Sequence, residues 1–178
     1  MTMTNTTLFY APSIPSTCIY LNIDGAIQTN IGLSIVGGMI RDETRKWILG
    51  YNRFLVKSSV FIVELWGILD GLLLLQKQGH DTILILLDNL EVVKVICNRN
   101  ANTSSISLVK GIQDILFQEK RWILRHIRRE DNQVADTLGK MAFANKEELC
   151  LFEDSQLVIQ ETVEEDIARG SLFPSSTL

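Results

Sequence analysis

The sequence predicts one α/β domain built on a five-stranded mixed sheet with helices on its faces. Three observations predict this class: the first third of the chain holds short extended apolar segments, helical periodicity starts only after residue 58, and later strands alternate with helices. Strands joined by short polar loops pair antiparallel, whereas strands joined through helices pair parallel. The order expected along the chain is β-β-β-α-β-α-α-β-α.

The first three strands are expected to form an antiparallel meander. Residues 17–24 are rich in Ile and Tyr and end at an Asp-Gly pair, which we interpret as a strand followed by a turn. Residues 34–41 and 46–54 are the next two strands. The segment 42–45 between them lacks apolar side chains, which is typical of a tight turn.

A long helix and a buried strand follow the meander. From residue 58 to about residue 78, apolar side chains recur at spacings of three and four, with Ser58 or Ser59 as the N-cap and Gly79 as the end of the helix. Residues 82–87 are a continuous run of Thr, Ile and Leu, which is typical of a strand buried on both faces.

The rest of the domain is predicted as three helices and one strand. In order, these are a short helix at 90–97, a polar loop at 98–105, a helix from Ser105 or Ser107 to residue 118, a strand at 121–127, and a last helix capped by Asp131 or Asn132 that runs to about residue 144.

The length and composition fit one domain with two appendages. The chain has 178 residues, of which 46% are hydrophobic, and a formal net charge of -4. We expect an irregular leader at 1–16, the domain at 17–144, and an acidic tail at 145–178 that is weakly helical or partly disordered. The acidic balance counts against a dedicated nucleic-acid binder unless basic residues are concentrated locally.

Cysteine usage and hydropathy predict an intracellular protein. The three cysteines lie far apart and form no CxxC pair, which argues against a zinc site or a disulfide framework. The start of the chain lacks a secretory signal pattern, and no apolar run approaches the roughly 20 residues that span a bilayer. We therefore expect an intracellular monomer, nuclear or cytoplasmic, without membrane contact.

Four acidic residues interrupt apolar segments. Asp24 ends the first predicted strand, Glu64 lies inside the apolar helix, Asp88 closes the most hydrophobic strand, and Asp136 lies in the second turn of the last helix. Buried carboxylates are costly unless something pairs with them, and hard divalent cations prefer oxygen ligands. Strand ends and helix starts can converge at one edge of an α/β sheet, where ligands commonly bind.

Each of these carboxylates also has a structural explanation. Asp24 precedes a glycine, as in many simple turns, and Glu64 fits an exposed helix position because the residues three and seven positions later are glycines. Those glycines allow close approach of the helix to the sheet or to a substrate, or serve ordinary close packing. Asp88 can cap the helix that follows it, and Asp136 is favoured near a helix N-terminus.

Five motifs along the chain form a pattern. They are LNIDGA at 21–26; GGMIRD at 37–42 with KW at 46–47 and GY at 50–51; ELWG at 64–67 with GL at 71–72; the aspartate at 88 followed by LEVV at 90–93; and REDNQVADTL at 129–138. This pattern resembles ribonuclease H type 1 domains, in the plant reverse-transcriptase-like branch that is often found in retrotransposon-derived proteins. The resemblance covers roughly residues 17–144, and its first and last motifs are the most specific.

The resemblance implies a fold, a reaction and a metal site. The family has a ribonuclease H-like fold, a five-stranded mixed sheet flanked by helices, and it cleaves the RNA strand of an RNA–DNA hybrid to leave a 5′-phosphate and a 3′-hydroxyl. By resemblance, Asp24, Glu64, Asp88 and Asp136 are the catalytic carboxylates and coordinate two Mg²⁺ ions, with Mn²⁺ as a substitute. Asp24 would bridge both ions, Glu64 and Asp88 would hold the water-activating side, and Asp136 would complete the other ion. Two such ions can flank one scissile phosphate.

A basic stretch provides candidate contacts to nucleic acid. Six basic side chains lie between positions 120 and 129. Hybrid recognition relies on shape and phosphate contacts, so a local strip would suffice. We predict contacts from Arg125, Arg128, Arg129 and Asn132, with a charged, solvated edge strand as the alternative. His126 is a candidate for the assisting histidine of several bacterial members, or else a packed or surface residue of its strand.

Some features depart from the family pattern. Arg45 stands in the hairpin turn where the family often has glycine, Gly67 stands where alanine is usual, and the loop 128–130 holds no histidine. An active ribonuclease H is therefore one hypothesis. A catalytically silent domain that binds nucleic acid or protein is the other, and a scaffolding domain that uses the acidic tail as its contact surface is a third.

Overall fold

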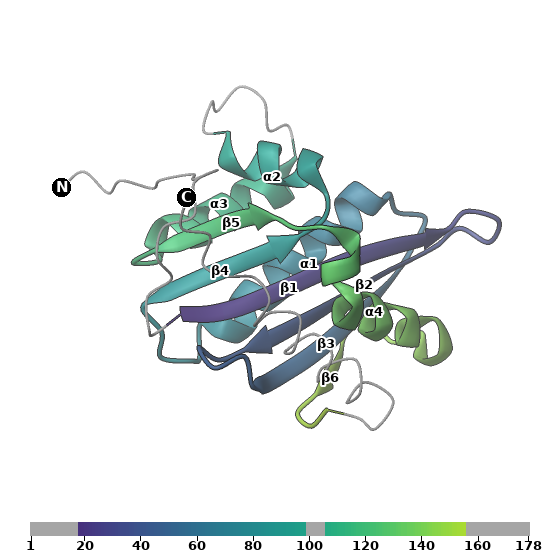
Figure 1. Ribbon diagram of the computed structural model, residues 1–178. Coiled ribbons are helices and arrows are strands. Elements are labelled where there is room, and N and C mark those ends of the chain that lie inside the picture. Colours follow the sequence, from purple (N-terminus) through teal and green to yellow (C-terminus); the bar gives the residue numbers. More distant parts are fainter. Residues whose placement is uncertain (1–17, 99–105, 156–178) are drawn as a thin grey trace.

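The computed structural model describes residues 18–98 and 106–155, and these begin with the predicted antiparallel meander (Figure 1). Strand β1 spans Cys18–Gln28, β2 spans Leu33–Arg41 and β3 spans Trp47–Val56. β1 pairs with β2 and β2 pairs with β3, each antiparallel. The tight turn predicted at 42–45 is confirmed, because the Asp42 carboxylate accepts hydrogen bonds from the backbone nitrogens of Thr44 and Lys46 at 2.8 and 2.9 Å.

The later strands extend this meander into a mixed sheet. β4 (Thr82–Leu87) pairs parallel with β1, and β5 (Trp122–His126) pairs parallel with β4. A three-residue strand, β6 (Cys150–Phe152), pairs antiparallel with β3. The sheet order is β5-β4-β1-β2-β3-β6, so β1 lies at the centre with β4 and β2 on its two sides (Figure 1).

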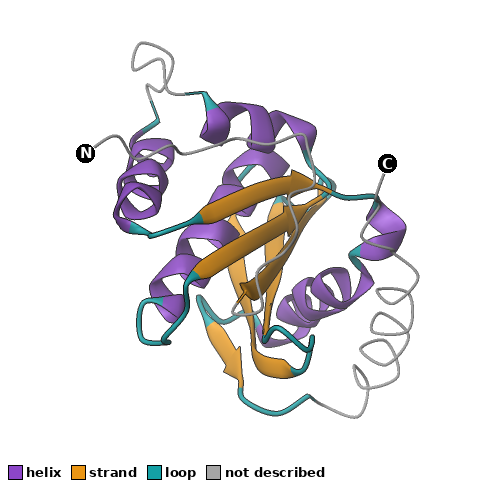
Figure 2. Ribbon diagram, turned by 60° about the vertical axis from the view of Figure 1, so that its left-hand side comes forward, coloured by secondary structure: helices purple, strands orange, loops and turns teal. Residues whose placement is uncertain are grey.

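The helices cover the two faces of the sheet unequally. On one face lie α1 (Val60–Leu75), α2 (Leu90–Cys97) and α3 (Ser107–Gln118), which contact one another. On the other face lies α4 (Gln133–Asn145), which follows the short 3-10 helix η1 (Arg129–Asp131) and contacts β1, β2 and β3. Figure 2 shows α1 and α4 on opposite sides of the strands.

The main core lies between the sheet and the helices of the first face. It is an apolar cluster of β1, β4, β5, α1, α2 and α3 side chains, among them Leu21, Ile68, Ile85 and Ile112. A smaller cluster under α4 contains Met39, Val134, Leu138 and Phe152. Burial of this much apolar surface is the main favourable term for the fold.

One backbone crossing brings α4 unusually close to the sheet. A methyl group at Gly37 would overlap the carbonyl oxygen of Ala135 and the backbone nitrogen of Gly139. A methyl group at Gly139 would in turn lie 3.0 Å from the nitrogen of Gly37. β2 and α4 therefore meet backbone to backbone, which only glycines allow.

The structure corrects several expected boundaries. Asp24 does not end its strand, because β1 continues for four residues to Gln28. The long helix ends at Leu75 with Gln76 as its C-cap, so Gly79 does not terminate it, whereas Ser59 caps its start as predicted. Ser107 does not cap α3 because it is the helix's first residue, and Ser105 lies outside the described residues.

The region predicted as a tail also contributes to the sheet. Residues 150–152 form β6, so the sheet has six strands rather than the five expected. The leader at 1–16, most of the polar loop and residues 156–178 lie outside the described residues. Among the helices of the described ranges, none is both long and apolar enough to cross a membrane.

Candidate functional site

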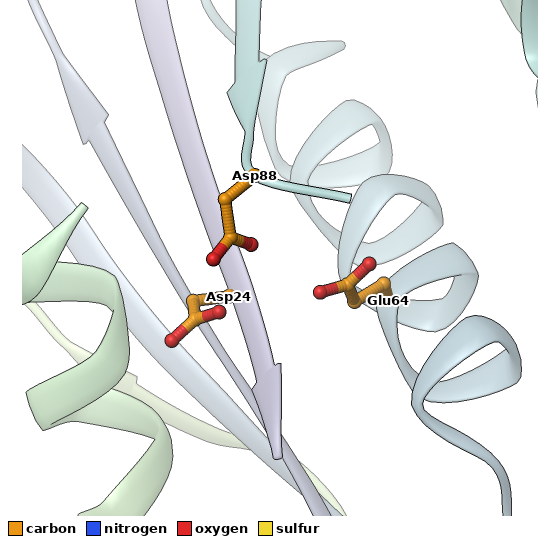
Figure 3. Close-up of side chains that lie close together, drawn as sticks. All are labelled: Asp24, Glu64 and Asp88. Carbon is orange, nitrogen blue, oxygen red and sulfur yellow. The ribbon is translucent and has the colours of Figure 1, made fainter. Parts of the chain in front are cut away.

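Three acidic side chains meet at one edge of the central strands. Asp24 projects from β1, Asp88 directly follows β4, and Glu64 lies in the second turn of α1. Because β1 and β4 are parallel and Asn22 is level with Leu86, Asp24 and Asp88 lie at the same height in the sheet. One carboxylate oxygen from each of the three residues lies within 4.8 Å of the other two (Figure 3).

Gly25 makes room for Glu64 beside the sheet. A Cβ atom at position 25 would lie 2.8 Å from Cγ of Glu64 and 2.8 Å from Cγ1 of Val63. Instead, the Gly25 backbone nitrogen donates a 3.4 Å hydrogen bond to Oε1 of Glu64. Glu64 is 1% exposed, which excludes the alternative that it occupies a solvated helix position. The Asp-Gly pair is therefore part of the site and not a turn.

Burial and mutual repulsion perturb the acidity of this cluster. Burial, and then the charges of Asp88, Asp136 and Glu64, raises the pKa of Asp24 from 3.8 to about 8. Burial, and then the charge of Asp88, raises the pKa of Glu64 from 4.5 to about 7, against hydrogen bonds from Asn89 and Gly25. A cation at this position would reverse both effects, because it favours the ionised carboxylates.

Two oxygens of the cluster have no hydrogen-bond donor within the described part of the chain. Asp24 Oδ1 and Glu64 Oε2 are buried and lack such a partner. Buried polar atoms are rarely left without partners, and the capacity to bind an ion is one physical reason for such an atom. The donor set is entirely carboxylate oxygen, which suits Mg²⁺ or Mn²⁺. The residues present therefore fit a divalent cation.

Asp136 approaches the cluster from the opposite face. It lies in the first turn of α4 and not in the second as expected, because the helix begins at Gln133, and there its charge and a side-chain hydrogen bond act on Asp24. It is not a member of the group of three that lie within 4.8 Å of one another. Its side chain is 34% exposed and pairs with Lys140 at 2.7 Å. Asp24 is thus the residue that both parts of the site share.

Basic side chains predicted from the sequence border this edge. Nε of Arg129 lies 3.5 Å from Oδ2 of Asp88, and the Arg129 side chain is exposed. Nε of Arg128 lies 3.1 Å from Oδ2 of Asp131. Nε2 of His126 is 2.9 Å from the backbone oxygen of Asp88, which can only accept, so this ring nitrogen carries the proton. Arg125 is half-buried on β5, and its Nη2 has no partner within the described residues.

The side chain of Asn132, which we predicted to contact nucleic acid, is buried. It is 2% exposed, and its Nδ2 donates a 2.6 Å hydrogen bond to the backbone oxygen of Ile23. Its Oδ1 accepts a 3.2 Å hydrogen bond from Nδ2 of Asn22. The structure therefore places this side chain inside the protein, at the base of α4.

Two buried polar residues near the site were not anticipated from the sequence. Asn22 is 2% exposed and accepts a 2.8 Å hydrogen bond from Nη2 of Arg41, which is 3% exposed. Asn22 precedes Asp24 by two positions and so points to the same face of the sheet. The polar residues at positions 22 and 24, on one face of an otherwise apolar strand, are the signal in the sequence that could have identified Asn22.

Comparison with known sequences identifies relatives of this chain. A family described as reverse transcriptase-like matches residues 22–142. The Arabidopsis thaliana protein named "Putative ribonuclease H protein At1g65750" is 30% identical over 128 residues, which is 71% of this chain. The match covers 20% of that relative, so this chain spans about a fifth of its length.

Solved structures share the fold. The N-terminal ribonuclease H domain of Rv2228c from Mycobacterium tuberculosis superposes with a TM-score of 0.65 at 20% identity, over 73% of this chain and 96% of that one. Ribonuclease H1 of the archaeon Halobacterium salinarum gives 0.61 at 19% identity, over 72% and 98%. LC11 ribonuclease H1, isolated from compost and solved in complex with an RNA/DNA hybrid, gives 0.64 at 19% identity, over 72% and 98%. At this level of identity the likeness concerns the fold.

Proposed function

The chain belongs to the reverse transcriptase-like family and has a ribonuclease H-like fold, and from this premise we propose that it is an endoribonuclease that cleaves the RNA strand of an RNA–DNA hybrid. The observation that carries the proposal is the Asp24, Glu64 and Asp88 cluster, in which two buried oxygens have no donor among the residues that the structure describes. A fold alone would not suffice, because one fold hosts many functions.

Four carboxylates would hold the metal in this proposal. Asp24, Glu64 and Asp88 form one group of ligands, and Asp24 with Asp136 forms the second. Two bound Mg²⁺ ions, or Mn²⁺ in their place, would supply a water of lowered pKa and neutralise charge on the phosphate and the leaving oxygen. The carboxylates fix where those ions bind, and their burial keeps competing water away.

Basic side chains would hold the hybrid against this edge. Arg125, Arg128 and Arg129 come from β5 and the segment after it, and Arg129 lies beside Asp88. Each can contact a backbone phosphate, which suits a substrate recognised by shape. His126, whose Nε2 lies 2.9 Å from the backbone oxygen of Asp88, would assist proton transfer at the edge of the site. The hybrid bound to LC11 ribonuclease H1 supports this class of partner.

A specific pair of contacts favours a second candidate, a catalytically silent domain that binds nucleic acid or protein. Arg129 pairs with Asp88 and Lys140 pairs with Asp136, so two of the four carboxylates already have a protein cation. A domain that no longer uses metal could keep its acidic residues in this way. The cation of each pair is exposed and so gains little from the pairing, and we expect a divalent ion to displace it.

The test is cleavage of a hybrid whose RNA and DNA strands carry different labels, in Mg²⁺, in Mn²⁺ and in EDTA. We expect metal-dependent cleavage of the RNA strand alone, and a fall of at least about 100-fold in Asp88→Asn, because a metal ligand supplies several kcal/mol. Asp114→Asn, an exposed aspartate of α3, is the matched control and should retain full activity.

The opposite result would be equally clear. If folded wild-type protein leaves both strands intact in Mg²⁺ and in Mn²⁺, the enzyme proposal fails. Retained binding of the uncut hybrid in the same samples would then support the silent binding domain.

A further inference from the structure

A chain of buried hydrogen bonds joins β2, β1 and the start of α4. Nη2 of Arg41 donates to Oδ1 of Asn22 at 2.8 Å, and Nδ2 of Asn22 donates to Oδ1 of Asn132 at 3.2 Å. Nδ2 of Asn132 then donates to the backbone oxygen of Ile23 at 2.6 Å. We call the Asn22–Asn132 part of this chain the amide relay.

The amide relay is directional, unlike apolar packing. Both asparagine side chains are 2% exposed, and a buried amide that loses its partner costs about 1–3 kcal/mol. Each group in the relay therefore has one favourable orientation. An apolar contact would tolerate sliding of α4 along the sheet, but the relay does not.

The relay connects the neighbours of two site carboxylates. Ile23, whose oxygen it binds, directly precedes Asp24 in β1. Asn132 is the N-cap residue of α4, yet its side chain makes no cap hydrogen bond and reaches back to β1 instead. The backbone oxygen of the same Asn132 accepts from the nitrogen of Asp136 at 3.2 Å. Asn132 thus makes hydrogen bonds both to the strand that carries Asp24 and to the helical turn that carries Asp136.

The other carboxylates do not depend on this link. α1, which carries Glu64, packs on the face of the sheet away from α4. Asp88 follows the end of β4, which is itself a strand of the sheet. We propose that Asn22 and Asn132 are positioning residues that set the place of Asp136 relative to Asp24, and so control the Asp136 half of the metal site while leaving the Glu64 and Asp88 half unaffected. The inference rests on the proposed function.

The chain provides a matched control on the same helix. Nδ2 of Asn52, which is 1% exposed on β3, donates a 2.9 Å hydrogen bond to the backbone oxygen of Leu138. Asn52→Ala therefore removes a buried amide bond to α4, as Asn132→Ala does. It leaves the connection between Ile23, Asn132 and Asp136 in place.

The experiment counts Mn²⁺ bound to the full chain, by electron paramagnetic resonance and by calorimetry, in wild type, Asn22→Ala, Asn132→Ala and Asn52→Ala. We expect two ions in wild type. Each relay variant should weaken one site about 10-fold or more, as loss of groups that orient metal ligands typically does, and change the other less than about twofold. Asn52→Ala should change both sites less than about twofold, even if its thermal midpoint falls as far.

Three results would overturn the inference. They are unchanged Mn²⁺ affinity in Asn132→Ala, equal weakening of both sites in that variant, and an Asn52→Ala variant that weakens one site as much as the relay variants do. The double variant Asn22→Ala/Asn132→Ala should weaken the site by less than the sum of the two single variants, because each single variant already breaks the bond that the two side chains share. Additive weakening would show that they act separately.

A measurement without metal separates this inference from the proposed function. Hydrogen exchange of the Asp136 amide in EDTA should accelerate about 10-fold in Asn132→Ala and less than about twofold in Asn52→Ala. Equal exchange in the two variants would overturn the positioning role whatever the activity. A wild-type protein that binds two Mn²⁺ ions but cuts no hybrid would overturn the proposed function but not the positioning role of Asn22 and Asn132.

Discussion

Helices α1 and α4 approach the same strand from opposite faces, and each delivers one carboxylate to Asp24. The half of α1 that carries Glu64 packs through apolar side chains, such as Val63 and Leu65, in the main core. α4 has only a small apolar cluster beneath it, and it is also held by buried amides and by the backbone contact between Gly37 and Gly139. Apolar packing adjusts to small changes, whereas directional bonds and backbone contacts do not. We therefore expect the Asp136 side of the site to tolerate substitutions less well than the Glu64 side.

The largest effect is expected where α4 crosses β2. In Gly37→Ala, the new methyl group meets backbone atoms of Ala135 and Gly139, which cannot move without displacing the helix. We expect a loss of about 3 kcal/mol or more in the free energy of unfolding, at the upper end of overpacking costs. Urea denaturation measures it, and a loss below about 1 kcal/mol would show that α4 is as adaptable as α1.

The next effect concerns Asp24, which lies between the two helices. Its pKa is raised from 3.8 to about 8. Below the lower value the carboxyl is protonated in both states, so the metal-free protein should lose stability as the pH rises from about 4 through about 8. Asp24→Asn removes this penalty. In EDTA at pH 8 we expect the variant to be more stable than wild type by on the order of 1–3 kcal/mol, while hybrid cleavage is lost.

Urea denaturation at pH 5 and at pH 8 provides the control for that prediction. At pH 5 the gain should be smaller, since only the first part of the stability loss between about pH 4 and pH 8 has then occurred. A gain that is equal at both pH values would mean that the burial of Asp24, and not its charge, is responsible.

A smaller effect is expected for the equivalent change on α1. In Gly67→Ala, the methyl group would lie 2.5 Å from Cγ2 of Val36 and 2.7 Å from Cγ2 of Ile23. These buried β-branched side chains are stiff and must shift, but no backbone atom opposes the methyl group as at Gly37. Alanine also favours the helix by up to about 1 kcal/mol. We expect a net loss of about 1–2 kcal/mol by urea denaturation. A loss as large as that of Gly37→Ala would remove the contrast between the two faces.

The smallest effect is expected in the hairpin turn away from both helices. Arg45 has a φ of 65°, a conformation that favours glycine, and its guanidinium lies 5.3 Å from the centre of the Tyr20 ring. Arg45→Gly relieves the backbone but loses the ring contact and adds chain entropy to the unfolded state. These contributions nearly cancel, so we expect the free energy of unfolding, measured by thermal denaturation, to change by less than about 0.5 kcal/mol. A larger change in either direction would show that one of them dominates.

The elements of the fold were predictable because each depends on local pattern. Helical and strand periodicity identified nine of them, and the loop lengths gave the sense of pairing. β6 was not predictable, because three residues carry no periodicity and their pairing with Gly50–Asn52 depends on chain a hundred residues earlier. The end of β1 was misjudged because the Asp-Gly pair was interpreted as a turn, whereas Gly25 accommodates Glu64.

Part of the site was predictable because it also depends on local sequence pattern. Acidic residues inside apolar runs are visible in the sequence, and Asp24, Glu64 and Asp88 are found together. The role of Asn132 was not visible, because its partner Asn22 lies 110 residues away and an asparagine after an aspartate is equally consistent with a surface cap. Orientation of a polar side chain inward or outward depends on which strand lies beneath it, and only the tertiary structure supplies that.

The short strand β6 has a consequence for self-association. Without it, the backbone groups of β3 at Gly50–Asn52 would form an open sheet edge, and such edges template pairing with other chains. Cys150–Phe152 occupy this edge from within the same molecule and are too short to offer a long new one. At the other end of the sheet, β5 is five residues long and carries a charged arginine and a polar histidine at positions 125 and 126. Both margins of the sheet are thus poor templates for aggregation, which leaves its central strands free to remain apolar.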